Sequence, residues 1–384
     1  MPDSSPPSES PPSTGAERLT DKVPSTISVR NVLGPVLLSL LVLAAIGYFT
    51  FDASAFRLMR EHLNPGFLGL AILTTFARVV LGGWRLSYIA QGRLNLMSGT
   101  RAQLAWEFFS NVTPSTIGGG PVATLYMARD QNLPVGETTA FFLFAMLMDQ
   151  LWFVVSIPVI IVATFNMELI PAAVGDIGLW TFMAFFAGML TWSCLFAYAT
   201  LFRPDLLERL ADRLFRFKYL ERFHERVMAE MRTFTRRART LRGQPARFYV
   251  KGFLITAGMW LMRYLLVLFV VWSVVANFDK LLLLFRTATM ILCSLIMPTP
   301  GGSGGLEGLY AFFIGPLMPD ALVAPTLLTW RTLGYYIFIA LGAYLFIHQV
   351  QKALKDRSDE PDAPTNGQSD SVSTVPSPTT EPTE

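Results

Sequence analysis

Long apolar segments alternate with short polar ones along most of the chain. Six of these segments have about the length that crosses a bilayer as a helix, roughly 20 residues, and they lie at 33–51, 66–84, 137–165, 179–202, 248–273 and 321–347. Two further regions, 102–133 and 281–318, are apolar but broken by proline and glycine. The pattern predicts an all-α polytopic membrane protein with about six full transmembrane helices and two re-entrant helical hairpins.

Both broken regions carry similar turn chemistry. The segments VTPSTIGGGP at 112–121 and MPTPGGSGGLEG at 297–308 each combine a Thr-Pro pair with a glycine cluster. In a bilayer, backbone outside helical hydrogen bonding is tolerated only where protein or a water-filled cavity satisfies it. We therefore expect a polar site at these turns, which contain Pro114, Gly118, Gly119, Gly120, Pro298, Pro300, Gly301, Gly302, Gly304 and Gly305.

The placement of basic residues predicts the orientation in the membrane. Residues 203–251 carry 14 Lys/Arg against 6 Asp/Glu, and such an excess beside spans marks the cytoplasmic side. Counting the spans from this loop puts both termini in the cytoplasm and lets the two hairpins enter from opposite faces. That arrangement is typical of inverted-topology repeats.

Residue spacing agrees with a repeat. Arg78 lies 36 residues before Pro114, and Arg263 lies 37 residues before Pro300. A second pair of arginines precedes the same prolines by 13 and 14 residues: Arg101 and Arg286. The alternative is chance spacing of arginines.

Four charged residues lie inside the predicted spans and away from their ends: Arg78, Asp149, Arg263 and Arg331. A charge at a helix centre costs about 2.5–3.5 kcal/mol on insertion scales, so each is expected to face a cavity or a partner. The alternative for Arg78 is snorkelling to the interface, and for Arg263 and Arg331 it is a buried ion pair. Asp149 is the expected acidic partner of one arginine.

The turns also bear on the ligand. Short helices that begin after them present unpaired N–H groups, which attract anions, and arginine binds phosphate in a bidentate manner. Glu307 is the exception in this positive environment. It is expected to pair with an arginine, carry a proton or contact a cationic headgroup. The alternative is a structural carboxylate at a helix N-terminus.

Composition supports a membrane location and excludes several classes. The chain is 52% hydrophobic and 15% charged, against roughly 25% charged residues in a soluble domain. The formal net charge of +3 says little, because the basic residues are placed unevenly. Nucleic acid is not an expected partner. Two cysteines in apolar segments and three scattered histidines predict no metal site. No nucleotide-binding glycine motif is visible, so no cofactor is expected.

The remaining segments flank or interrupt the predicted membrane domain at 31–350. Residues 1–30 and 351–384 are rich in Pro, Ser and Thr, the second stretch being acidic as well, and are predicted to be disordered tails. The basic connector 203–247 shows an amphipathic helical pattern. It predicts either a helix on an anionic leaflet or a solvated or protein-packed connector.

The motifs resemble a known family. TPSTIGGGP, PTPGGSGGLEG and the later TWR at 329–331 are similar to the lysylphosphatidylglycerol synthase transmembrane region, or flippase-like domain family, over roughly residues 30–350. The resemblance implies a bacterial inner-membrane protein that moves or handles lipids. In its best-known members a cytosolic domain transfers an aminoacyl group from tRNA to phosphatidylglycerol. Only about 36 residues follow His348, so we expect that domain to be absent.

The sequence therefore predicts a lipid transporter or flippase. It would move an amphipathic, phosphate-bearing lipid through a central cavity lined by Arg78, Asp149, Arg263, Glu307 and Arg331. One alternative is a membrane-embedded lipid-headgroup transferase that uses Glu307 or Asp149 as acid or base. Another is an integral-membrane partner of a separate lipid-modifying enzyme. Whether the chain is an enzyme stays open, and the expected partners are membrane lipids.

Overall fold

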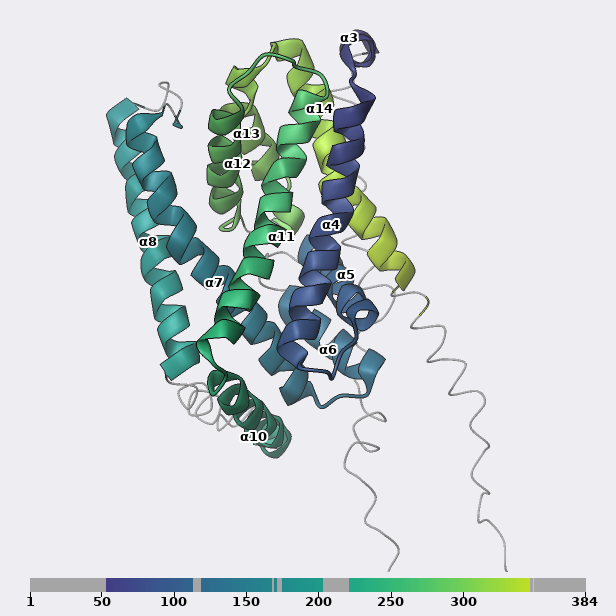
Figure 1. The fold of residues 1–384 in the computed structure, drawn as a ribbon, viewed down its shortest axis with the longest axis vertical. Coiled ribbons are helices and arrows are strands. Elements are labelled where there is room, and N and C mark those ends of the chain that lie inside the picture. Colours follow the sequence, from purple (N-terminus) through teal and green to yellow (C-terminus); the bar gives the residue numbers. More distant parts are fainter. Residues whose placement is uncertain are drawn as a thin grey trace, which may run out of the picture. The chain divides into compact units, whose positions relative to one another are not determined.

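The computed structural model describes residues 53–112, 119–167, 169–170, 175–202, 221–297, 299–345 and 348. The described residues form helices and contain no strand (Figure 1). Four helices are long and apolar enough to cross a membrane: Pro65–Ala90, Val135–Asn166, Ile177–Tyr198 and Ala246–Trp272. They overlap four of the predicted spans. The predicted span at 33–51 and the predicted tails at 1–30 and 351–384 lie outside the described residues.

Helix α4 (Pro65–Ala90) follows the short helix α3 (Ala53–His62). The Asn64 side chain accepts a hydrogen bond from the Gly66 N–H, and Pro65 occupies the first helical position, where its missing N–H costs nothing. The helix ends only at Gln91, which has a left-handed backbone with φ 52°. Helix α4 is therefore about two turns longer than the predicted span 66–84, and this extension brings one more charged residue into the helix.

Helices α4 and α11 (Ala246–Trp272) run antiparallel against each other along their length. At one end the Asn64 N–H donates to the Ser273 carbonyl at 2.6 Å. At the other end Tyr88 stacks on Phe248 with ring centroids 5.0 Å apart. Because α4 begins where α11 ends, the elements that follow each of them lie toward opposite ends of this pair (Figure 1).

Each member of the pair leads into a broken helical region. After α4 come α5 (Leu96–Val112) and α6 (Gly119–Gln131), then α7 (Val135–Asn166) and α8 (Gly175–Phe202). After α11 come α12 (Lys280–Ser294), the short 3-10 turn η2 (Pro300–Gly302) and α13 (Gly305–Phe313). A second 3-10 turn, η3 (Gly315–Leu317), leads to α14 (Asp320–Arg331). We call α5 with α6 the first broken pair and α12 with α13 the second.

The predicted span 321–347 is not one regular helix. Helix α14 ends at Arg331, a π-helix, η4, covers Thr332–Tyr336, and α-helix resumes up to Leu345. A π-helix widens the helical turn and is frequent at functional sites. Here it begins directly after the buried Arg331.

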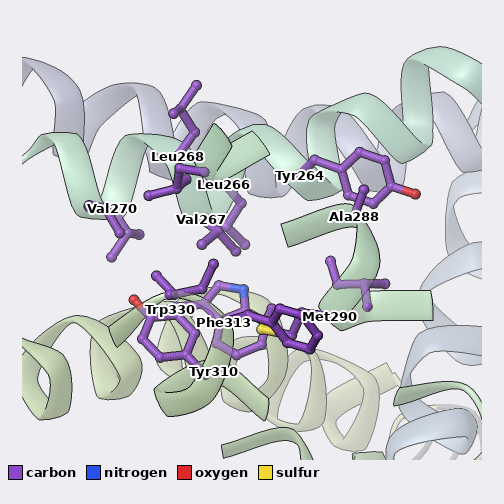
Figure 2. Packing of buried hydrophobic residues seen from close by; sticks show 14 of the residues in the cluster. Tyr264, Leu266, Val267, Leu268, Val270, Ala288, Met290, Tyr310, Phe313 and Trp330 are labelled. Carbon is purple, nitrogen blue, oxygen red and sulfur yellow. The ribbon is translucent and has the colours of Figure 1, made fainter. Parts of the chain in front are cut away.

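An apolar core joins the second broken pair to α11 and α14 (Figure 2). Val267 from α11, Met290 from α12 and Phe313 from α13 are fully buried in it. Tyr310 of α13 stacks on Trp330 of α14 with centroids 5.2 Å apart. This stacking fixes the position of α14 one residue before Arg331.

The second half of the basic connector forms α10 (Glu221–Arg242). Phe234, Ala238 and Leu241 are buried on one face of it, and α10 packs against α7. The Gly136 N–H, in the first turn of α7, donates to the Glu230 carboxylate at 2.5 Å. This half of the connector therefore packs on protein. Its first half, 203–220, lies outside the described residues, and a contact with the leaflet stays a prediction.

Candidate functional site

Arg78 lies in the middle of α4 and is only 4% exposed. Its Nη2 is 3.4 Å from the Glu107 Oε2 on α5, and its guanidinium lies 4.8 Å from the Phe338 ring centroid. The contact with Glu107 is an ion pair but not a hydrogen bond, because Nε and Nη2 of Arg78 have no hydrogen-bond partner in the described part of the chain. Arg78 is thus buried in the protein, and the snorkelling alternative does not describe it.

Arg263 lies on the facing helix α11 and is partly buried. Its guanidinium lies 5.4 Å from the ring centroid of Trp260, one turn earlier. Helix α11 packs antiparallel against the helix of Arg78, in the register set by the Asn64–Ser273 and Tyr88–Phe248 contacts. No carboxylate of the described residues lies within ion-pair distance of Arg263, so the predicted buried ion pair is not observed there.

Asp149 on α7 pairs with Arg85, an arginine that the sequence analysis did not consider. Arg85 Nη1 donates to Asp149 Oδ1 at 2.6 Å, and Arg85 is only 1% exposed. The indole N–H of Trp260 donates to the same oxygen at 2.9 Å. The predicted span ended at residue 84, whereas α4 continues to Ala90 and encloses Arg85. The available signal was its position seven residues after Arg78, about two turns along one helix face.

Arg331 pairs with Glu307 across the second broken pair. Its Nε and Nη2 both donate to Glu307 Oε1, at 2.8 and 2.5 Å, while Nη1 donates to the Gly301 carbonyl at 3.1 Å. The other carboxylate oxygen of Glu307 accepts the Gly304 N–H at 2.6 Å. Two of the alternatives for Glu307 therefore hold together: it pairs with an arginine and caps the start of α13.

The turn of the second broken pair requires glycine for conformation and for space. The backbone is left-handed at Gly301, Gly302 and Gly304, with φ 58°, 69° and 86°. A Cβ at Gly301 would also lie 2.0 Å from a ring atom of Tyr335. Of the remaining predicted turn residues, Pro114, Gly118 and Pro298 are outside the described residues, whereas Gly119 and Gly120 open α6, Gly305 opens α13 and Pro300 opens η2.

The two broken pairs meet. The Tyr335 hydroxyl donates to the Asn111 carbonyl at the end of α5, at 3.2 Å, and η2 packs against α5. Arg331 lies 4.9 Å from the ring of the same Tyr335. Helix α5 also carries Glu107, the partner of Arg78. The structure therefore brings Arg78, through Glu107, and Arg331, through Tyr335, against α5 at positions one helical turn apart.

The two arms of each broken pair are also joined by an arginine. Arg101 on α5 is 3.1 Å from the Asp130 carboxylate on α6. Arg286 on α12 donates to the Phe313 carbonyl at the end of α13, at 3.1 Å. These are the two arginines with matched spacing in the sequence. They occupy comparable positions, although one contacts a carboxylate and the other a carbonyl.

Comparisons with known proteins place this arrangement in a family. A family model described as "Lysylphosphatidylglycerol synthase TM region" matches residues 36–342. A protein of Archaeoglobus fulgidus described as a "UPF0104 membrane protein" is 23% identical over 322 residues, which cover 80% of this chain and 94% of that protein. No solved structure matches the chain. The resemblance that the two glycine-rich motifs predicted is confirmed.

Proposed function

The chain belongs to the family of the lysylphosphatidylglycerol synthase TM region, and on that premise we propose that it is a lipid transporter of the flippase type. The lipid headgroup would cross the bilayer between the two broken pairs while the acyl chains stay in the hydrocarbon. The observation that carries the proposal is that α5 of the first broken pair contacts the turn η2 of the second pair and Tyr335 of η4, with the buried Arg78 and Arg331 beside these contacts. Charged side chains at membrane depth mark substrate pathways by default.

We also propose that the two halves are inverted repeats. Helices α5 and α12, α6 and α13, and α7 and α14 begin 184, 186 and 185 residues apart. Each set follows one member of the antiparallel α4–α11 pair, so the two broken pairs lie toward opposite ends of it (Figure 1). This geometry supports re-entrant hairpins that enter from opposite faces, as in transporters that alternate access around a central site.

The basic excess at 203–251 supports a cytoplasmic location for α10 and for both termini. The first broken pair, near the α10 end of the molecule, would then open toward the cytoplasm, and the second would open outward. Transport would require the broken pairs to separate in turn, because each carries part of the polar lining. The bacterial cytoplasmic membrane is the expected location.

A reversible cross-link between α5 and the helix that follows η4 tests this mechanism. That helix continues from α14, whose Arg331 holds the turn of the second broken pair. A Cβ at Gly342 would lie 2.3 Å from the Phe108 Cβ on α5, so a small outward shift brings two cysteines there to the roughly 3.5–4.5 Å of a disulfide. The double variant Phe108→Cys/Gly342→Cys would be made with Cys194 and Cys293 replaced by serine. It would be reconstituted in vesicles that contain acyl-labelled fluorescent phospholipids.

Dithionite bleaches only the fluorescent lipids in the outer leaflet. If the protein exchanges lipids between leaflets, the fluorescent lipids of the inner leaflet become accessible and are bleached as well. We expect exchange from the wild type and from the reduced variant, and its loss when the cross-link forms. The reduced sample is the control for folding. Equal exchange in the oxidised and reduced samples would contradict a mechanism in which the broken pairs separate. Mass spectrometry of the same vesicles would reveal a modified headgroup if the chain were a transferase instead.

A further inference from the structure

The buried charges of the α4–α11–α5 region do not balance. Arg85 and Arg331 each have a carboxylate at hydrogen-bond distance. Arg78 has only an ion pair, with its Nη2 3.4 Å from the Glu107 carboxylate. Arg263 has no carboxylate partner among the described residues. Arg78, Arg263 and Glu107 together carry one excess positive charge in an apolar surrounding, where an uncompensated charge is costly.

Arg78 also retains unused hydrogen-bond donors. Its Nε and Nη2 are buried and have no hydrogen-bond partner among the residues that the structure describes, and a buried donor left unsatisfied costs about 1–3 kcal/mol. Each other fully buried arginine named above donates at least one hydrogen bond to a carboxylate or a carbonyl oxygen. Of these buried arginines, Arg78 is therefore the one best able to donate hydrogen bonds to a bound acceptor.

Arg263 is held in place by packing on its aromatic neighbour. Its guanidinium faces the Trp260 ring at 5.4 Å, and the Trp260 N–H is fixed on Asp149. The register of α4 against α11, set by Asn64 with Ser273 and Tyr88 with Phe248, puts Arg263 about one helical turn along α11 from the residues opposite Arg78. Two cations on facing helices in a low-dielectric environment are stabilised when an anion binds both.

The helices that carry the two arginines also present apolar side chains. Phe76 and Val80 are 47% and 46% exposed and lie two residues from Arg78, on the opposite face of α4, and Leu261 of α11 is 40% exposed. Both helices are candidate membrane spans. Arg78 and Arg263 therefore lie at a depth that the headgroup of a lipid passes when it crosses the bilayer.

We propose that Arg78 and Arg263 together bind the phosphodiester of a lipid headgroup, with Glu107 limiting the site to a single negative charge. A phosphodiester carries one negative charge, which matches the excess of one, whereas a phosphomonoester carries nearly two at pH 7. Two guanidiniums supply the planar donor pairs that phosphate oxygens accept. This inference rests on the proposed function in one respect: the phosphodiester is taken to belong to a transported lipid.

The experiment measures binding to the full-length protein in uncharged detergent, by titration calorimetry. The probes are short-chain phosphatidylglycerol, a short-chain diacylglycerol, and dimethyl phosphate as a phosphodiester without chains. Arg263→Gln is the test variant, because this side chain makes no hydrogen bond or ion pair with the described residues, so the change should leave the fold intact. Lys251→Gln is the matched control, since Lys251 is an exposed cation on the same helix, 5.0 Å from the ring of Tyr88.

We expect Arg263→Gln to weaken phosphatidylglycerol binding by at least about tenfold, Arg263→Lys to restore part of it, and Lys251→Gln to match the wild type. Diacylglycerol should bind no better to the wild type than to the test variant. Unchanged phosphatidylglycerol affinity in Arg263→Gln would overturn the site. Equal affinity for dimethyl phosphate and phosphatidylglycerol would overturn the lipid as its source.

Vesicle exchange separates this inference from the proposed function. Equal exchange of phosphatidylglycerol and of an uncharged glycolipid, neither affected by Arg263→Gln, would overturn the phosphodiester site and leave the transporter intact. Arg263-dependent binding without any exchange in the wild type would overturn the transporter and leave the site. Exchange of phosphatidylglycerol that falls in Arg263→Gln but not in Lys251→Gln would support both the transporter and the phosphodiester site.

Discussion

The two broken pairs are joined to the rest of the molecule by different means. In the second pair, Arg331 of α14 donates to Glu307 and to the Gly301 carbonyl, so the helix that follows the pair holds its turn directly. In the first pair, the helix that follows is α7, and its charged residue Asp149 contacts Arg85 of α4 instead. One half thus uses the charge of its last helix to fix its own turn, and the other uses it to fix a neighbouring helix.

This difference indicates how strongly each half depends on single buried side chains. Three hydrogen bonds from one buried guanidinium reach the second turn, while the described contact between the arms of the first pair is Arg101 with Asp130, at 38% and 19% exposure. Buried pairs lose far more on disruption than exposed ones. The second broken pair should therefore depend more on single side chains than the first.

The largest effect is expected for Arg331→Gln. The change leaves the Glu307 carboxylate buried without its cation and removes the donor to the Gly301 carbonyl, and breaking a buried pair in this way costs about 3–5 kcal/mol. Equilibrium unfolding in mixed micelles would measure it. The double variant Arg331→Gln/Glu307→Gln should recover part of the loss, because no lone charge remains. A double variant less stable than Arg331→Gln alone would contradict the pairing.

Much of this region was visible in the sequence, and the reasons are physical. The Thr-Pro and glycine clusters disfavour a continuous helix, so both broken regions could be located, and four predicted spans overlap the observed apolar helices. Glu307 could be singled out because a carboxylate beside a glycine turn in an apolar segment needs a partner. Its partner Arg331 was among the predicted site residues, but which pair would form was left open.

Other parts could not be read from sequence. Arg85 was missed because apolar content falls at residue 84, although helix geometry continues to Ala90. Glu107 was missed because a carboxylate in a broken, mixed region carries no pattern of its own, and its meaning comes only from α5 packing on α4. The π-helix after Arg331 has no periodicity signal either, since an apolar segment reads the same in both helical forms.

An intermediate effect is expected for Gly301→Ala. The new Cβ would meet the Tyr335 ring at 2.0 Å, and φ 58° disfavours any side chain, for which the left-handed backbone alone costs roughly 1–2 kcal/mol. Gly304→Ala has the same kind of backbone, with φ 86°, but no atom within 4 Å of its Cβ. Thermal unfolding should therefore rank Gly301→Ala below Gly304→Ala, and both below Gly308→Ala, where helix and open space accept a methyl group. Equal stability of Gly301→Ala and Gly304→Ala would contradict this ranking, because it would show that the Tyr335 ring moves aside without cost.

The smallest effect is expected for Arg101→Gln, in the first broken pair. An ion pair as exposed as Arg101 with Asp130 contributes about 0.2–1 kcal/mol, and raising the salt concentration screens it further. Unfolding of Arg101→Gln and of the wild type should therefore differ slightly at low salt and converge at high salt, while the loss in Arg331→Gln persists. If Arg101→Gln were as damaging as Arg331→Gln, and salt did not reduce the damage, the first pair would depend on a single side chain as strongly as the second. The asymmetry between the two halves would then be wrong.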